Sequence, residues 1–210
     1  MNETLNGTLN DTLTETASAM RNETMNEMEE NYGLERVELL KRELRYTGSV
    51  LHVYQDTVLV KGHEAKWDFI HHMGAAAVVP VLEDGRIVMV RQYRHALGRF
   101  TLEIPAGKLD FEGEPMQDCA IRELHEESGF VSSEPEYLMT VNTTVAFCDE
   151  KIGIYVCRNL KKAEQSLDPD EEINIEFWDV EELKKKIFAG EMTDGKTVAA
   201  ILAYDAKYCR

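Results

Sequence analysis

The sequence predicts a mixed α/β fold in which a small strand subdomain precedes one main domain. Strand-like segments are separated by glycine-containing turns, and later segments have the boundaries and periodicity of helices. The length of 210 residues, 43% of them hydrophobic, suits one domain with a sizeable core and an appendage. We therefore divide the chain into residues 1–33, 34–72 and 73–210.

The first two parts differ in composition. Residues 1–33 are rich in Asn, Thr, Glu and Met, which predicts a disordered or weakly helical acidic tail. A short amphipathic stretch then begins at Leu34. Residues 48–61 alternate in the manner of a strand, and we expect a turn at 62–63 and a second strand at 65–71, which together form a hairpin.

The main domain shows further strand and helix patterns. Residues 75–80 and 86–93 are predicted to form a second hairpin around the Asp84-Gly85 turn. We also expect strands at residues 136–145, 152–157 and 173–178 and helices at 181–188 and 197–208.

The most informative stretch runs from residue 107 to residue 130, GKLDFEGEPMQDCAIRELHEESGF. Proline is favoured in the first turn of a helix and glycine just after its end. Pro115 and Gly129 occupy these positions and predict one helix over Met116–Ser128.

Three carboxylates lie together on this predicted helix. Glu123, Glu126 and Glu127 stand at i, i+3 and i+4, and therefore share one face. Such a cluster of hard oxygen ligands suits Mg²⁺ or Mn²⁺. The alternative is a solvated acidic face, but the fixed spacing of the neighbouring arginine and glycines makes the whole pattern more specific than the glutamates alone.

These residues resemble the Nudix box, the signature of the Nudix hydrolase family. Glu114, seven further residues and the run from Arg122 to Phe130 match the box well. Two departures occur: six residues rather than five separate Gly107 from Glu114, and Phe130 takes the final aliphatic position. We expect the loop to accommodate this extra residue without a change in the helix.

The resemblance extends to the ADP-ribose pyrophosphatase subgroup of this family. It is carried by residues 90–94 (VRQYR), 102–110 (LEIPAGKLD) and 190–197 (GEMTDGKT). The resemblance implies an α/β/α Nudix sandwich. It also implies a homodimer in which the N-terminal strand subdomain is exchanged between the protomers.

The resemblance further implies a metal site. Glu123 and Glu127 would be the principal ligands, joined by the backbone carbonyl of Ala106, with Glu126 as a further ligand. Arg122 would orient the glutamates by ion pairing, although an ordinary surface arginine is the alternative. Mg²⁺ is the expected ion, and Mn²⁺ is the alternative.

A general base need not lie within the box. In related enzymes a glutamate in a later loop takes this role, and Glu150 matches its place before a strand. Asp149 is the second candidate, and a loop carboxylate without a role is the remaining alternative.

Three further residues are expected at the substrate. Arg94 resembles an arginine that contacts the diphosphate or terminal ribose, and guanidinium geometry suits bidentate contact with phosphate. Glu103 matches an acid close to the substrate. Trp67 resembles a tryptophan that stacks on adenine, although a lone tryptophan often belongs to the core. For Arg94 the alternative is a surface arginine at a strand end.

Charge and composition exclude several classes of function. Acidic residues outnumber basic ones by 39 to 23, and the formal charge of -16 argues against binding nucleic acid. We expect no membrane segment, because no run approaches 18 apolar residues. Four scattered cysteines and the lack of a signal-peptide pattern favour the cytoplasm.

The leading functional interpretation is hydrolysis of the pyrophosphate of ADP-ribose or a related ADP-sugar to AMP and ribose 5-phosphate. In a second interpretation the Nudix box has the same role, but the substrate is a GDP-sugar, NADH or another nucleoside diphosphate derivative. A third is a non-catalytic module that senses ADP-ribose, which loss of a box carboxylate would favour; all are present.

Overall fold

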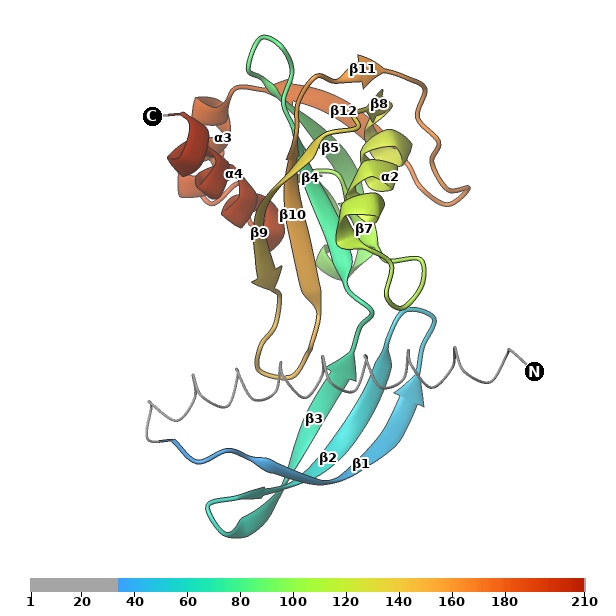
Figure 1. Ribbon diagram of the computed structural model, residues 1–210, viewed down its shortest axis with the longest axis vertical. Helices are drawn as coiled ribbons and strands as arrows, with labels where there is room; N and C mark the ends of the chain where they lie inside the picture. The colour runs from blue at the N-terminus through green and yellow to red at the C-terminus, as the bar shows by residue number, and fades with distance from the viewer. Residues whose placement is uncertain (1–33, 210) are drawn as a thin grey trace, which may run out of the picture. The chain divides into compact units, whose positions relative to one another are not determined.

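The computed structural model describes residues 34–209 (Figure 1). Within this range the chain forms two compact units. Residues 34–42 and 56–66 belong to the first, and residues 43–55 and 67–209 to the second. The predicted acidic tail lies outside the described residues.

The N-terminal strands form a three-stranded sheet in the order β1 (Glu38–Thr47), β2 (His52–Val60) and β3 (His63–His71). The hairpin of β2 and β3 confirms the predicted pair of strands, although the first strand begins at His52 rather than at residue 48. The predicted position of the turn was wrong by one residue, because Lys61 and Gly62 adopt positive φ angles of 49° and 77° and His63 already begins β3.

The amphipathic stretch after Leu34 leads into β1, which is joined to β2 by an ion pair. Arg42 donates from Nε and Nη2 to the carboxylate of Asp56 at 2.8 and 2.7 Å. Asp56 is only 7% exposed, and the hydrogen bonds from Arg42 lower its pKa despite burial. A bidentate arginine of this kind stabilises a carboxylate that would otherwise be costly to bury.

A mixed four-stranded sheet lies at the centre of the second unit. Its order is β7 (Ala106–Lys108), β4 (Ala75–Pro80), β10 (Lys151–Cys157) and β9 (Pro135–Asn142). β4 and β10 run parallel, and the outer pairs are antiparallel. Every residue of β4 is buried, which explains its uninterrupted apolar sequence.

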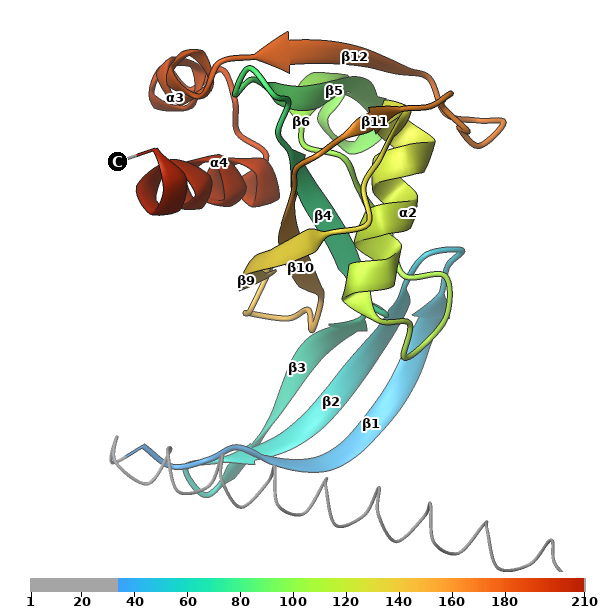
Figure 2. The ribbon, with the colours of Figure 1, turned by 45° about the horizontal axis from the view of Figure 1, so that its top comes forward.

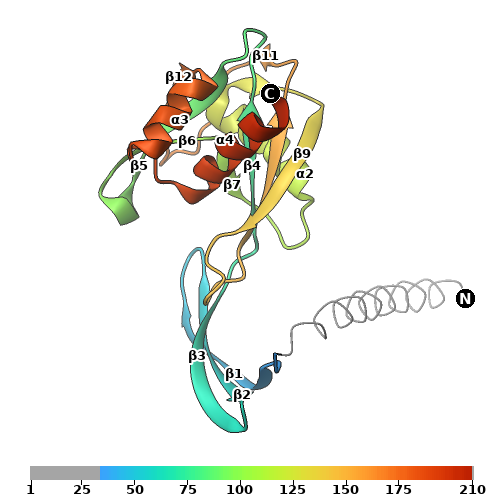
Figure 3. The same ribbon diagram turned by 90° about the vertical axis from the view of Figure 1, so that its left-hand side faces the viewer.

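Helices cover both faces of this sheet. On one face, α2 (Met116–Ser128) packs Ala120 and Leu124 against the even-numbered residues of β4. On the other lie α3 (Val180–Phe188) and α4 (Gly195–Tyr208) (Figure 3). Leu183 of α3 and Ile201 of α4 belong to the same buried cluster as the odd-numbered residues of β4. The predicted α/β/α sandwich is therefore confirmed.

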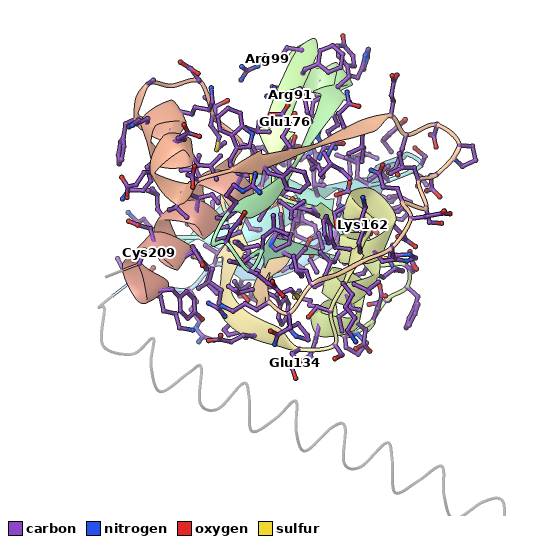
Figure 4. The ribbon with its side chains drawn as sticks, turned by 90° about the horizontal axis from the view of Figure 1, so that it is seen from above. Arg91, Arg99, Glu134, Lys162, Glu176 and Cys209 are labelled. Atoms are coloured by element: carbon purple, nitrogen blue, oxygen red, sulfur yellow. The ribbon has the colours of Figure 1, made fainter. Side chains whose placement is uncertain are left out.

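A second, antiparallel sheet contains β12 (Ile173–Trp178), β5 (Ile87–Arg94) and β6 (Arg99–Glu103), as Figure 2 shows. The 3₁₀ turn η2 (His95–Leu97) connects β5 to β6, and β8 (Phe130–Val131) pairs with β11 (Lys161–Lys162). Arg91 of β5 pairs with Glu176 of β12 across this sheet (Figure 4).

The predicted hairpin of β4 and β5 was wrong, although its turn is present. Gly85 has a φ of 88°, and Val81 pairs with Ile87. Beyond that bridge the strands enter different sheets, because both edges of β4 are occupied by β7 and β10. A strand buried on both faces requires such neighbours to satisfy its backbone groups.

Most other boundaries agree with the sequence expectation. α2 has the predicted ends, while α3 and α4 begin one and two residues early. β9 ends at Asn142 rather than residue 145, because the chain turns where Phe147 and Cys148 donate to the carbonyl of Thr144. No helix within residues 34–209 is long and apolar enough to cross a membrane.

Candidate active site

The helix α2 positions the three clustered glutamates. Pro115 precedes its first turn in an extended conformation, and Gly129 ends it with a φ of 64°. The amide of Gly129 donates to the carbonyl of His125 at 3.0 Å. Glycine adopts this left-handed conformation at little cost, so the end of the helix is defined by the sequence.

Two of the glutamates are buried. Glu123 is 8% exposed and Glu127 is 4% exposed. Burial raises the pKa of Glu123 to about 7 and that of Glu127 to about 8, although Arg122 lowers the first and the amide of Ala106 the second. The charge of Glu123 raises the pKa of Glu127 further, because two carboxylates this close repel each other when both are ionised.

Gly107 provides the space that Glu123 occupies. A Cβ atom at position 107 would lie 2.0 Å from Oε1 of Glu123 and 2.2 Å from its Cδ. No side chain larger than hydrogen fits without displacing this carboxylate. The first glycine of the box therefore leaves room for the carboxylate of Glu123, despite the longer loop that follows it.

Arg122 joins the glutamates to the neighbouring strand. Its Nη1 donates to Glu123 at 2.7 Å and to Glu126 at 3.0 Å, and Nη2 donates to the carbonyl of Lys108 at 3.1 Å. Burial lowers the pKa of Arg122, but Glu123 and the other acceptors raise this pKa by more than burial lowers it. The guanidinium is therefore charged. It therefore compensates part of the acidic cluster.

The donor set fits a divalent cation. Carboxylates on adjacent helical turns, two of them buried, are hard oxygen ligands whose mutual repulsion a cation relieves. The carboxylates turn toward Arg122 and the amide of Ala106, and within residues 34–209 no three His, Cys, Asp or Glu side chains converge on one point. Binding a cation would thus require their side chains to rotate.

A cavity of about 740 Å³ lies beside β7. A cavity of this volume can accommodate a nucleotide-sized ligand. Its wall includes the β5–β6 connection, β7, the β9–β10 connection and the start of α4. Among the predicted site residues it contains Arg94, Glu103, Ala106 and Glu150.

Two glutamates of α2 contact residues of the same wall. Glu127 accepts a hydrogen bond from the amide of Ala106 at 2.8 Å, and Glu123 lies against Gly107. Both Ala106 and Gly107 line the cavity. The structure therefore brings the box residues next to the cavity, although their side chains do not form its wall.

Glu103 is buried between two cations at the cavity. Arg94 donates to it from Nε and Nη2 at 2.8 and 2.7 Å, and Lys196 and Thr101 also donate to it. Burial raises its pKa, but Arg94 and Lys196 outweigh this and lower the pKa to about 2. The 2% exposed carboxylate is therefore ionised and holds Arg94 at the cavity.

Sequence reasoning did not assign several cavity residues. Lys196 belongs to the GEMTDGKT segment, whose resemblance was noted without a role for any of its members. Lys196 pairs with Asp194 at 2.9 Å as well as with Glu103. His72 and Thr143 gave no local signal, because only the tertiary structure brings them to the cavity.

The two candidate bases have different surroundings. Glu150 lines the cavity and accepts a hydrogen bond from the hydroxyl of Thr143 at 2.6 Å. Asp149 instead accepts from the amide of His72 at 2.8 Å and lies 2.7 Å from Nδ1 of His71. Of the two carboxylates, Glu150 is therefore the one available to a ligand in the cavity.

Trp67 lies apart from the other predicted residues. It belongs to β3, is 48% exposed and is absent from the cavity wall. Its exposure argues against an ordinary core tryptophan.

Comparison with known proteins identifies one matching family model and several relatives that align with most of the chain. A family model described as NUDIX domain matches residues 71–200. The chain is 37% identical over 165 residues to the methanol dehydrogenase activator of Bacillus methanolicus and 34% identical over 165 residues to the ADP-ribose pyrophosphatase of Bacillus subtilis. Each match covers 77% of this chain and 89% of the relative.

Two further matches agree. The chain is 32% identical over 172 residues to the ADP-ribose pyrophosphatase of Mycobacterium tuberculosis, covering 80% of this chain and 83% of the relative. A crystal structure of an ADP compounds hydrolase matches with a TM-score of 0.73 at 19% identity, covering 84% of this chain and 96% of that one. At this identity the structural match supports the fold alone.

Proposed function

This chain belongs to the Nudix family and is a Nudix hydrolase, and we propose that it cleaves the pyrophosphate of ADP-ribose or a related ADP-sugar to AMP and ribose 5-phosphate or the corresponding sugar phosphate. Relatives named ADP-ribose pyrophosphatase, at 32% and 34% identity over most of the chain, support this substrate class.

The observation that carries the proposal is the position of the box against the cavity. Glu127 accepts a hydrogen bond from Ala106 and Glu123 lies against Gly107, and both of these backbone positions line a cavity whose wall also contains Arg94 and Glu150. Once the glutamate side chains rotate toward a cation, the ligands of that cation, the guanidinium of Arg94 and the carboxylate of Glu150 would all serve one bound diphosphate.

Glu123, Glu127 and the carbonyl of Ala106, with Glu126, would hold Mg²⁺ or Mn²⁺. The ion would reduce the negative charge of the diphosphate and lower the pKa of an attacking water. Arg122 orients Glu123 and Glu126, and Arg94 binds a phosphate or the terminal ribose.

Glu150 takes the proton from the attacking water in this proposal. Its place in the cavity wall supports it over Asp149, whose carboxylate is engaged by His71 and His72. Glu103 does not accept this proton, because its low pKa and its bonds to Arg94 and Lys196 leave it a weak base.

We further propose a homodimer formed through residues 34–72, with Trp67 contacting adenine. The exposed position of Trp67 supports this role. Trp67→Ala is expected to raise the KM for ADP-ribose more than for a ligand without adenine, and equal changes for both would contradict the contact. A cytoplasmic location is also proposed, supported by the scattered cysteines.

A second candidate is cleavage of another nucleoside diphosphate derivative. The relative at 37% identity is named methanol dehydrogenase activator, so similarity of sequence does not by itself specify the substrate. The box acts on the pyrophosphate, whereas base and sugar are selected elsewhere in the cavity.

The test is product analysis of the purified full chain given ADP-ribose, GDP-mannose and NADH, with Mg²⁺ and with a chelator. We expect AMP and ribose 5-phosphate to form fastest from ADP-ribose and only with metal. The double variant Glu123→Gln, Glu127→Gln serves as the control for contaminating hydrolases.

Faster cleavage of GDP-mannose or NADH would replace the proposed substrate while keeping the hydrolase assignment. Equal turnover in the chelator would contradict the metal site. No cleavage of any of the three would contradict the proposed substrate class.

A further inference from the structure

The connection between β9 and β10, residues 143–150, is held in place by backbone hydrogen bonds. The amide of Thr143 donates to the carbonyl of Glu150 at 3.3 Å and closes the connection at its base. The amide of Ile70 donates to the carbonyl of Phe147 at 2.7 Å, and the amide of Asp149 donates to the carbonyl of Ile70 at 3.2 Å. Glu150 therefore follows a segment that is tied to the end of β3.

Asp149 adds a side-chain contact to this attachment. Its Oδ1 accepts from the amide of His72 at 2.8 Å, and its Oδ2 lies 2.7 Å from Nδ1 of His71. Burial raises the pKa of Asp149, but the bonds from His71 and His72 outweigh this and lower it. Asp149 thereby fixes the backbone at His72, whose imidazole lines the cavity next to Glu150.

The two carboxylate oxygens of Glu150 have different neighbours. Oε2 accepts a hydrogen bond from the hydroxyl of Thr143 at 2.6 Å. Oε1 lies 3.4 Å from Nδ1 of His72. That nitrogen accepts from the amide of Gly74 at 3.1 Å, so its lone pair is engaged and the ring proton belongs on Nε2.

The two carboxylate oxygens of Glu150 therefore differ in how freely they can accept a proton. Because Nδ1 of His72 accepts from Gly74, it does not donate to Oε1 of Glu150. Oε2 is restrained by Thr143, which also limits rotation of the carboxylate. Oε1 is left as the oxygen that can accept a proton from a water in the cavity.

We propose that Thr143 is a positioning residue that restrains Oε2 of Glu150 and so directs Oε1 toward the attacking water, while the amide of Gly74 occupies Nδ1 of the neighbouring His72. This rests on the proposed function, in which Glu150 is the base. A base contributes fully only when it is held within hydrogen-bond reach of the proton it accepts.

The test compares Thr143→Val, Thr143→Ser and Thr144→Val in the full chain with ADP-ribose and Mg²⁺. Valine preserves the shape of threonine without its hydroxyl, and Thr143 is exposed, so the fold should be retained. We expect Thr143→Val to lower kcat about 10-fold with little change in KM, as for loss of one hydrogen bond to a charged group. Thr143→Ser should restore most of kcat.

Thr144→Val is the matched control in the same connection and should leave kcat unchanged. Equal kcat for Thr143→Val and the wild type would overturn the proposal, as would a loss that Thr143→Ser does not restore. Thermal unfolding of each variant separates these results from a loss of folded protein.

Glu150→Gln distinguishes failure of this inference from failure of the proposed function. Adding Thr143→Val to Glu150→Gln should cause no further loss, because the restrained base is already gone. If Glu150→Gln retains wild-type kcat, Glu150 is not the base, and the positioning role falls with it while cleavage of ADP-ribose stands. If the wild type itself does not cleave ADP-ribose, the proposed function fails. If Glu150→Gln abolishes turnover while Thr143→Val does not change it, only the positioning role is overturned.

Discussion

The most buried glutamate on α2 is Glu127, and its environment differs from that of Glu126. Glu127 is 4% exposed and accepts from Ala106, whereas Glu126 is partly exposed and pairs with Arg122. If the carboxylate of the buried Glu127 is removed, little water can reach this position to replace it as a metal ligand. The role of Glu127 can therefore be tested by a change of charge with no change of shape.

Glu127→Gln is expected to lower kcat by about 100-fold or more, since loss of residues that only support metal ligands already costs 10–100-fold. Its amide oxygen can still accept from Ala106, so the melting temperature should change little. Steady-state kinetics and thermal unfolding provide the measurements. Glu112→Gln, an exposed change in the preceding loop, is the control, and wild-type turnover in Glu127→Gln would refute the ligand role.

Glu103 should contribute stability that depends on pH. Its folded pKa of about 2 lies below the ordinary value of 4.5, so the contribution is complete above pH 4.5 and is lost as the pH falls toward 2. The shift corresponds to about 3 kcal/mol. Urea unfolding of wild type and Glu103→Gln across this range should show a difference that narrows on acidification. A difference that stays constant would contradict this linkage.

At the scale of elements, the junction of β7 and α2 leaves no space for a side chain at Gly107 while Glu123 keeps its position. Gly107→Ala is expected to reduce kcat about 100-fold by displacing Glu123, because misplacement by about 1 Å has costs of this size. Kinetics of the single variant and of Gly107→Ala with Glu123→Ala provide the test. Adding Gly107→Ala to Glu123→Ala should cause little further loss, so two independent, additive losses would contradict the clash.

At the scale of the whole molecule, β1 bears apolar side chains that a single chain leaves exposed. Leu40, Leu44 and Tyr46 share one face of this strand and are 45%, 54% and 61% exposed. Exposed apolar groups of this density are typical of association surfaces. They support the proposed homodimer.

The dimer predicts twice the chain mass of 24.0 kDa in sedimentation equilibrium. The double variant Leu40→Glu, Leu44→Glu should sediment at 24.0 kDa, because it places charges within the proposed interface. Leu39→Glu, on the opposite face of β1, is the matched control and should keep the dimer. Wild-type protein that sediments at the mass of one chain would contradict the proposal.

The sequence alone determined the elements that depend on local chemistry. Pro115 and Gly129 specify the ends of α2, because their backbone preferences act within a few residues. The helical period places Glu123, Glu126 and Glu127 on one face. The box and the segments around Arg94 and Glu103 were sufficient to predict the family, which the comparisons confirm.

Only the tertiary structure decided what depends on pairing between distant segments. The apolar runs of β4 and β5 predict two strands but not which neighbours they pair with, and they entered separate sheets. Thr143 and His72 meet at Glu150, and Lys196 meets Glu103 across 93 residues, through sheet and helix packing. Local sequence encodes backbone preference, whereas such contacts arise from burial of apolar faces between layers.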